Sequence, residues 1–261
     1  EHLSMPGKLM GLASLGTTDP VARAWLQQRE WLRHPASERA IVRDEIRRGL
    51  PHLPFAALTD RDSGCHVLAA TMQWHLEDEV LAYVRRWREA TGARTLYYSG
   101  GAALNVHANT RLEREGGFDA ILIPPAPSDA GLALGAAAFL EWRAGEVVLE
   151  HPPFLNDVPP RNAEETLRTG LPIVRAPKDA ARAVARGEVV GVWAGKAEIG
   201  PRALGHRSLL ARPDSVELRR RLSERMKGRE WYSPVAPMLL GEVAREALIG
   251  HRPGSVLSRF M

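Results

Sequence analysis

The sequence predicts an α/β protein, because strand-like and helix-like segments alternate along it. Between residues 95 and 145 a β-prone run, a glycine turn, a helical segment, a second β-prone run and a capped helical segment follow one another. This order is typical of β–α–β units. A third β-prone run, Val189–Trp193, opens the C-terminal part of the chain. The 261 residues are enough for one large or two modest domains.

The longest predicted helix covers residues 66–90. Its apolar side chains recur at helical spacing: Leu76, Val80, Val84 and Trp87. Gly92 lies where a helix-ending glycine is expected. The preceding residues 17–62 are rich in Arg, Trp and Leu with scattered Pro, and we expect helices and loops there.

The elements after this helix are short. We predict strands over 95–98 and 118–123, with a helix over 105–115 between them. Ser128 or Asp129 then starts another helix, since either side chain can accept hydrogen bonds from the first backbone N–H groups. This helix is predicted to end at Gly145.

Prolines mark a domain boundary after that helix, because they break the periodic pattern. We predict one domain over residues 1–148, a linker over 149–164 and a second domain over 165–261. The second domain should contain a helix near Asp179–Arg186 and the strand Val189–Trp193. Asp214 and Glu217 resemble a capping box and predict a further helix start.

Charge is unevenly distributed along the chain. The formal net charge is +4, but residues 202–229 hold nine Arg or Lys against three acidic residues, which makes +6 there. Such a stretch indicates an anionic partner, either a phosphorylated small molecule or a nucleic acid.

Cys65 is the single cysteine, which excludes an intrachain disulfide and a cysteine zinc cluster and favours a reducing cytoplasm. No apolar run is long enough to span a membrane.

The segment Glu198–Ser208 carries the strongest chemical signal. It packs two arginines, a serine and two glycines into a stretch with no helix or strand period. Glycine lets the backbone approach a ligand, and arginine offers a fork of donors that matches phosphate or carboxylate. A second basic segment, Lys227–Pro237, follows after one predicted helix. Together the two segments predict a site for a small polyanion.

These segments resemble the ATP-dependent O-carbamoyltransferases, a family that adds carbamoyl groups to antibiotics and nodulation signals. Its pattern is approximately E-x-GPRALG-x-RS followed by K-x-RE-x-x-RP-x-AP, and the chain departs from it at Ser233, where the family usually has arginine. Further matches lie at Ser99–Asn105 and Pro125–Ala137, with a weaker one at Gly7–Ala13. The resemblance covers nearly the whole chain.

The resemblance implies the C-terminal part of an actin/hexokinase-type ATPase-like lobe, followed by a YrdC-like α/β domain. It implies a cytoplasmic enzyme that forms carbamoyl adenylate from ATP and carbamoyl phosphate. The carbamoyl group then goes to a hydroxyl of a small-molecule acceptor, as in antibiotic biosynthesis. The resemblance also implies magnesium (Mg²⁺) and iron (Fe²⁺), the latter held partly by a His-x-x-x-His pair that this sequence lacks. We therefore expect this chain alone to be incomplete for transfer. Histidine with carboxylate would equally suit zinc or manganese, so the metal stays open.

The resemblance also assigns roles to residues. The catalytic residues would be Arg202, Arg207 and Lys227. Nucleotide and phosphate groups would be bound by Gly100, Gly101, Asn105, Arg202, Arg207, Ser208, Lys227 and Arg229. Asp129 would be a metal ligand, and Trp231 could stack on adenine.

Several residues also have plainer interpretations. Asp129 is equally suited to be a helix cap, and Gly100-Gly101 to be a simple tight turn. Glu198 is a candidate base or magnesium ligand, but a salt bridge to Arg202 or Arg207 is an equal alternative. Basic residues 219–221 fit a solvated surface.

Two other functions stay open at this point. Related ATPase-like and YrdC-type proteins modify tRNA through threonylcarbamoyl adenylate, and a basic helix could follow a phosphate backbone. The chain could also be an inactive scaffold. The order of the motifs favours the small-molecule enzyme, so we expect neither a membrane nor a nucleic-acid partner. The sequence leaves the oligomeric state open.

Overall fold

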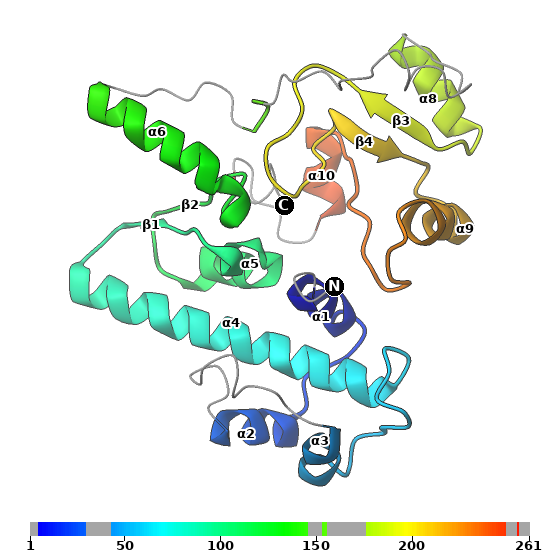
Figure 1. Ribbon diagram of the computed structural model, residues 1–261. Helices are drawn as coiled ribbons and strands as arrows, with labels where there is room; N and C mark the ends of the chain where they lie inside the picture. The colour runs from blue at the N-terminus through cyan, green and yellow to red at the C-terminus, as the bar shows by residue number, and fades with distance from the viewer. Residues whose placement is uncertain (1–4, 30–42, 146–152, 156–175, 249–254, 256–261) are drawn as a thin grey trace. The chain divides into compact units, whose positions relative to one another are not determined.

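Residues 5–29, 43–145, 153–155, 176–248 and 255 are described in a computed structural model (Figure 1). The chain forms two compact units whose segments interleave. Unit 1 comprises Glu1–Leu96, Asn105–Ile121 and Tyr232–Pro234, and unit 2 comprises the rest. Helices alternate with two small sheets, which confirms the α/β class. The linker predicted over 149–164 lies, except for 153–155, outside the described residues.

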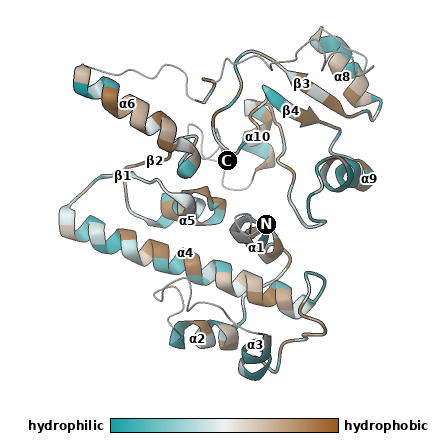
Figure 2. Ribbon diagram, in the orientation of Figure 1, coloured by the Kyte–Doolittle hydropathy of each residue, from teal (hydrophilic) through white to brown (hydrophobic). Residues whose placement is uncertain are grey.

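Unit 1 is built around the long helix α4 (Ser63–Thr91), which confirms the helix predicted over 66–90. Gly92 ends it in the left-handed region at φ 67°, and its N–H donates to the Arg88 carbonyl at 2.9 Å. Three shorter helices precede α4 in the chain: α1 (Met5–Ala13), α2 (Pro20–Gln28) and α3 (Arg43–Gly49). Figure 2 shows alternating polar and apolar residues along α4.

The core of unit 1 lies where these helices meet α4. One buried cluster joins α1 to α4: Ala13, Ala69 and Ala70. A second joins α2, the residues after α3, and α4: Ala22, Leu50, Leu53 and Leu68. Small residues in the first cluster allow the two helix backbones to approach closely.

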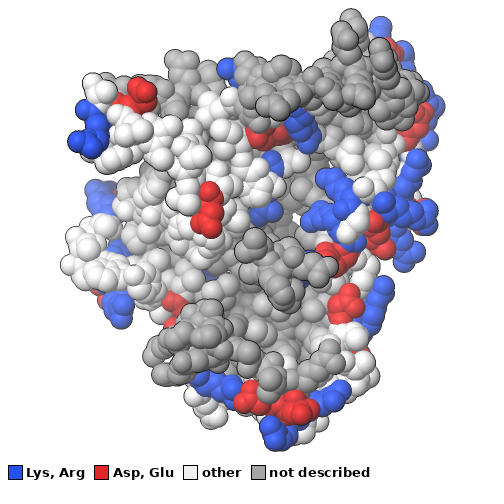
Figure 3. Space-filling view, in the orientation of Figure 1, with Lys and Arg blue, Asp and Glu red and all other residues white. Residues whose placement is uncertain are grey.

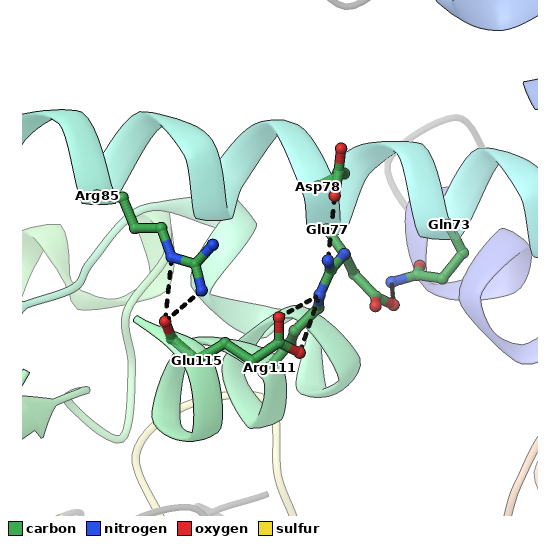
Figure 4. Close-up of polar contacts among 6 residues, drawn as sticks. All are labelled: Gln73, Glu77, Asp78, Arg85, Arg111 and Glu115. Carbon is green, nitrogen blue, oxygen red and sulfur yellow. Dashed lines mark hydrogen bonds and ion pairs between the residues drawn. The ribbon is translucent and has the colours of Figure 1, made fainter. Parts of the chain in front are cut away.

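Helix α5 (Val106–Glu115) packs on α4 through a polar network (Figure 4). Arg111 donates to Asp78 at 3.0 Å and forms an ion pair with Glu115 at 3.2 Å. Arg85 donates twice to the backbone carbonyl of Glu115, at 3.1 and 2.7 Å. The network fixes the C-terminal part of α5 against α4.

Strands β1 (Thr95–Tyr97) and β2 (Ala120–Leu122) flank α5 and pair with each other. They confirm the strands predicted over 95–98 and 118–123, although each is shorter. The N–H of Asp119 donates to Arg94 and that of Tyr98 to Leu122, at 2.8 and 2.9 Å. The strands therefore run in the same direction, with α5 as the crossover helix that a parallel pair requires.

Beyond β2, unit 2 begins its helical part with the 3₁₀ turn η4 (Asp129–Gly131) and helix α6 (Leu132–Ala144). Gly145 ends α6 as predicted, and its N–H donates to Glu141 at 3.0 Å. The helix is largely apolar (Figure 2) and has no buried residue.

The second sheet of unit 2 pairs β3 (Val190–Trp193) with β4 (Arg207–Leu210) in antiparallel register, so that Trp193 lies opposite Arg207. Strand β3 and helix α8 (Pro177–Ala185) were predicted. The expectation that the whole segment 198–208 lacks strand structure is wrong, since its last two residues begin β4. Those residues belong to a strand that continues into Leu209 and Leu210, beyond the motif.

Helix α9 (Val216–Arg220) continues directly into the π-helical turn η5 (Arg221–Met226). The cap is Ser215, whose hydroxyl accepts from the Leu218 N–H at 3.2 Å. The predicted start at Asp214 is wrong, because Asp214 instead pairs with Arg212 at 2.9 Å. Helix α10 (Gly241–Ala247) follows in the chain. Among the described residues, no helix combines the length and apolarity needed to cross a membrane.

Candidate active site

Three segments that are distant in sequence meet within unit 2: Ser99–Leu104, Pro125–Asp129 and Gly200–Arg202. We call them the loop cluster. The Gly100 N–H and the Ser99 hydroxyl both donate to the Pro127 carbonyl, at 2.6 and 2.9 Å. Arg202 Nη2 donates to the Leu104 carbonyl at 3.1 Å. The predicted motifs at 99–105, 125–137 and 198–208 therefore contribute to one place.

The glycine turn of the cluster is confirmed as a turn. Gly100 has φ 102°, which only glycine adopts readily, and η3 (Gly101–Leu104) follows it. A Cβ atom built on Gly100 or Gly101 would meet no other atom within 4 Å. The backbone at both glycines thus faces open space, which leaves room for a ligand.

Two other glycines allow the segments of the cluster to touch. Gly200 has φ 100°, and a Cβ atom there would overlap the Pro125 carbonyl oxygen. A Cβ atom at Gly131 would similarly overlap the carbonyl oxygen of Ala126. Gly200 thus allows segment 200–202 to contact segment 125–129, whereas Gly131 allows the turn that follows Ala126 to fold back on it.

Asp129 presents an uncommitted carboxylate. Ser128 occupies the cap position of η4, as predicted, but its side chain makes no capping bond, and Asp129 lies in the first turn and not at the cap. The chain instead enters α6 through a 3₁₀ turn in which the Gly131 N–H donates to the Ser128 carbonyl at 2.8 Å. Asp129 is exposed, and no described residue forms a hydrogen bond or ion pair with its carboxylate.

Asp129 fits one ligand of a metal ion but does not make a site by itself. A hard divalent cation prefers several oxygen ligands. Within the described ranges, no group of three or more His, Cys, Asp or Glu side chains is placed to hold a metal. Asp129 as a metal ligand therefore stays a prediction.

Arg202 lies half-buried in the cluster, and no described carboxylate forms an ion pair with it. Its Nε is buried and has no hydrogen-bond partner among the described residues. Burial lowers the pKa of this guanidinium, and the positive charge of Arg229 lowers it further. Arginine nevertheless stays protonated, so the site holds a cation whose charge is not balanced by a partner.

Glu198 organises the segment Glu198–Ser208, which we call the signature segment. Of the alternatives for Glu198, the salt bridge to Arg202 or Arg207 is wrong, because neither arginine forms an ion pair with it. The carboxylate Oε1 of Glu198 accepts from the N–H groups of Leu204, His206 and Arg207, at 2.8, 2.8 and 3.1 Å. Burial alone would raise the pKa of Glu198, but these backbone donors lower it to about 2. The carboxylate is therefore ionised near neutral pH and is a poor proton acceptor there.

Arg207 also stabilises this segment, through contacts with the end of β3 and the residues that follow it. Its guanidinium lies 3.9 Å from the centre of the Trp193 ring and donates to three carbonyls. These belong to Ala194, Gly195 and His206, at 2.8, 3.1 and 2.9 Å. Ser208 accepts from the Gly205 N–H at 3.0 Å. Direct phosphate contacts of Arg207 and Ser208 stay predictions.

The second basic segment is divided between the units. Lys227 and Arg229 are exposed and belong to unit 2, whereas Ser233 belongs to unit 1 and is only 7% exposed. The neighbours of Ser233, Tyr232 and Pro234, lie against Gly11 of α1. The position where the family usually has arginine is thus a packed one. Convergence of Lys227 with Arg202 and Arg207 stays a prediction.

Asn105 is held in unit 1 by contacts that the sequence did not reveal. It caps α5 by accepting from the Ala108 N–H at 3.0 Å, and it exchanges two amide hydrogen bonds of 2.9 Å with Gln73. Gln73 lies buried on α4. Gln73 is a polar residue on the apolar side of the predicted helix, and this was the only sign in the sequence of its contact with Asn105. A nucleotide contact of Asn105 stays a prediction.

The chain belongs to the carbamoyltransferase family. The family model of the carbamoyltransferase N-terminus matches residues 2–138, and that of the carbamoyltransferase C-terminus matches residues 181–261. The loop cluster therefore takes residues from both matched regions.

Curated relatives include two proteins of Bradyrhizobium diazoefficiens. Nodulation protein NolO is 35% identical over 261 residues, covering 92% of this chain and 46% of the relative. Nodulation protein U is 30% identical over 272 residues, covering 94% and 45%. Nodulation protein NolNO of Sinorhizobium fredii is 37% identical over 190 residues, covering 69% and 28%. The chain thus spans about half or less of the length of these relatives.

Proposed function

We propose that this chain contributes to ATP-dependent O-carbamoyl transfer onto a small hydroxylated acceptor. Membership of the carbamoyltransferase family supports the transferred group. The observation that carries the rest is the loop cluster, where a half-buried arginine without a carboxylate partner contacts an open glycine turn, and where the backbone of Pro125 and Pro127 borders both. A phosphorylated substrate would supply the negative charge that this arrangement lacks.

The proposed reaction has three steps. Water first hydrolyses carbamoyl phosphate to carbamate and phosphate. A carbamate oxygen then attacks the α-phosphorus of ATP and displaces pyrophosphate, which gives carbamoyl adenylate. Finally the acceptor hydroxyl attacks the carbamoyl carbon, loses its proton to water and displaces AMP. All three steps move phosphoryl or acyl groups that carry concentrated negative charge, and fixed cations near them lower the barrier.

In this proposal the chain's own residues mainly bind and position. Arg202, Lys227 and Arg229 would neutralise phosphate oxygens, while the N–H groups near Gly101 would face the nucleotide. Glu198 and Arg207 would act indirectly by keeping the signature segment in shape.

The proposal extends to Mg²⁺ with ATP and to Fe²⁺ at Asp129. A divalent cation bound there would polarise the carbamoyl oxygen. Among the residues that the structure describes, no group of three or more His, Cys, Asp or Glu side chains is placed to hold this ion. Cys65 is partly buried, and burial raises the pKa of its thiol. A single unreactive thiol fits the reducing cytoplasm that we propose as the location.

Nucleic-acid binding is less well supported. Basic side chains do gather with acidic ones near α9 (Figure 3). Arg225 pairs with Glu217 at 3.0 Å, and Arg219 donates to the Trp231 carbonyl at 3.4 Å. These contacts use part of the basic charge internally, which favours a solvated face over a phosphate-backbone track.

The experiment is to measure ATP binding and ATP–pyrophosphate exchange for the chain and for Arg202→Ala. Losing one charge-assisted contact costs about 1.5–3 kcal/mol, so affinity should fall about 10- to 150-fold. Arg186→Ala is the matched control, because Arg186 is an exposed arginine already paired with Glu188. No ATP binding by the unaltered chain, or equal binding by both variants, would refute the proposal.

A further inference from the structure

Arg202 connects two loops that are far apart in the sequence. It belongs to the region matched by the C-terminal family model, whereas Leu104 belongs to the region matched by the N-terminal model. Its Nη2 nonetheless donates to the Leu104 carbonyl at 3.1 Å, across 98 positions of sequence. Leu104 is the last residue of η3, so the contact holds the far end of the glycine turn.

The other hydrogen bonds described for the glycine turn lie at its near end or within it. At its near end, Ser99 and Gly100 both donate to Pro127. Within the turn, the Ala103 N–H donates to the Gly100 carbonyl at 3.0 Å. Gly100 and Gly101 have no side chains to restrain them, and the space beside them is open. Loss of the contact to Leu104 should therefore loosen the turn.

The same guanidinium still has donor capacity. Nε is buried and lacks a partner among the described residues, and the nearby charge of Arg229 disfavours the guanidinium cation unless an anion is present. A guanidinium is rigid and planar with five N–H donors, so an anion and a carbonyl can be bound at once. A group fixed by an anion holds its carbonyl partner more firmly.

We propose that Arg202 is a positioning residue that couples binding of a phosphate-bearing ligand at the signature segment to the order of the glycine turn 99–104. The inference rests on the proposed function and adds a direction of communication to it. Ligand binding at one loop would prepare the other loop for the nucleotide. The coupling needs arginine, because lysine carries the charge but cannot span two partners in a fixed plane.

The test is hydrogen exchange of peptides covering 99–104, with inorganic pyrophosphate as the probe. In the unaltered chain, saturating pyrophosphate should slow exchange about threefold or more. Without ligand, Arg202→Lys should exchange faster than the unaltered chain in these peptides and equally in α4. Arg212→Lys is the control, since Arg212 donates to Ala185 and Asp214, outside the loop cluster.

The outcomes separate the two proposals. If the unaltered chain does not bind pyrophosphate, the proposed phosphate site fails, and this inference fails with it. If pyrophosphate binds but exchange over 99–104 is unchanged, only the coupling is refuted. Equal exchange of Arg202→Lys and the unaltered chain without ligand would also refute it, because the Leu104 contact would then not restrain the turn.

Discussion

Arg111 and Arg202 are both partly buried arginines, yet they lie in opposite electrostatic surroundings. Each has one buried nitrogen without a hydrogen-bond partner, Nη1 in Arg111 and Nε in Arg202. Burial would lower the pKa of Arg111, but Asp78 and Glu115 raise it overall. Burial lowers the pKa of Arg202, and a second arginine lowers it further. The α4–α5 interface neutralises its cation, whereas the loop cluster leaves a cation available.

This difference separates polar residues that hold the fold from those that can bind a ligand. In Figure 4 the polar side chains of α4 and α5 mostly face one another. In the loop cluster, Asp129 and part of Arg202 face no described partner of opposite charge. Unbalanced charge is costly in a folded protein, and such cost is common where a site awaits its substrate.

The largest expected effect comes from removing the close backbone contact of the loop cluster. Gly200→Ala should cost about 3 kcal/mol, because an L-residue at φ 100° is strained and its Cβ would also overlap the Pro125 carbonyl. Gly228→Ala is the control, since φ is 59° there and no atom lies within 4 Å of a Cβ. It should cost about 1 kcal/mol. Urea denaturation compares the two, and equal costs would mean that the contact with Pro125 is not rigid.

Arg111→Ala should destabilise the α4–α5 interface, where the arginine charge is neutralised. It removes contacts to Asp78 and Glu115, whose side chains are 43% and 44% exposed and can be hydrated instead, so the loss should be about 1–2 kcal/mol. Arg94→Ala, in a mostly exposed pair with Asp119, should cost less than about 0.5 kcal/mol. Pyrophosphate affinity should not change in either variant. A drop in affinity for Arg111→Ala would show that the two regions are not functionally separate.

The long helix α4, the helix α5 and the strands β1 and β2 could be predicted because their signals are local. The helix over α4 follows from apolar spacing and from Gly92, which ends it in the left-handed region. The strand β4 was missed, because its first residues are the polar end of a motif and its apolar part is only Leu209 and Leu210. Periodicity cannot identify so short a strand.

The sequence predicted the motifs of the candidate site, but not the backbone contacts that bring them together. The residue types of Gly100 and Arg202 indicated a phosphate site, and the family resemblance implied that Asp129 is a metal ligand. Their meeting depends on contacts such as Arg202 with Leu104, which no local pattern encodes. The role of Glu198 was hidden for a related reason: its partners are backbone N–H groups, which nearly every residue has.

Glu198→Gln tests whether the signature segment is held by charge. The folded pKa of Glu198, about 2, lies below the 4.5 of an unperturbed glutamate. The ionised group therefore stabilises the fold above pH 4.5, and this contribution is lost as pH falls toward about 2. The variant should be less stable by about 1 kcal/mol at pH 7, a modest loss because the segment is partly open to water.

The same variant should approach the unaltered chain in stability as pH decreases below about 4.5, where the carboxylate begins to be protonated. Urea denaturation at pH 7, 5 and 3.5 would follow this convergence. A difference that is the same at all three pH values would mean that shape, and not charge, accounts for the role of Glu198.

The smallest expected effect distinguishes two aspartates at helix starts. Asp19 caps α2: its Oδ1 accepts from the Ala22 N–H at 2.7 Å and contacts His52 at 3.0 Å. The Ala22 bond is the main cause of its lowered pKa. Asp19→Ala should therefore cost about 1 kcal/mol. Asp129→Ala should change stability by less than about 0.5 kcal/mol, since its side chain makes no capping bond.

A second measurement shows what the free carboxylate of Asp129 does. Anaerobic titration with Fe²⁺ should show weaker binding in Asp129→Ala and unchanged binding in Asp19→Ala, because only the uncommitted carboxylate can turn toward a cation. If Asp129→Ala instead loses as much stability as Asp19→Ala and binds the cation normally, Asp129 is a structural residue. In that case the acidic residue of the loop cluster would have a structural role, as the acidic residues of the α4–α5 interface do. Only the unpaired charge of Arg202 would then distinguish the two regions.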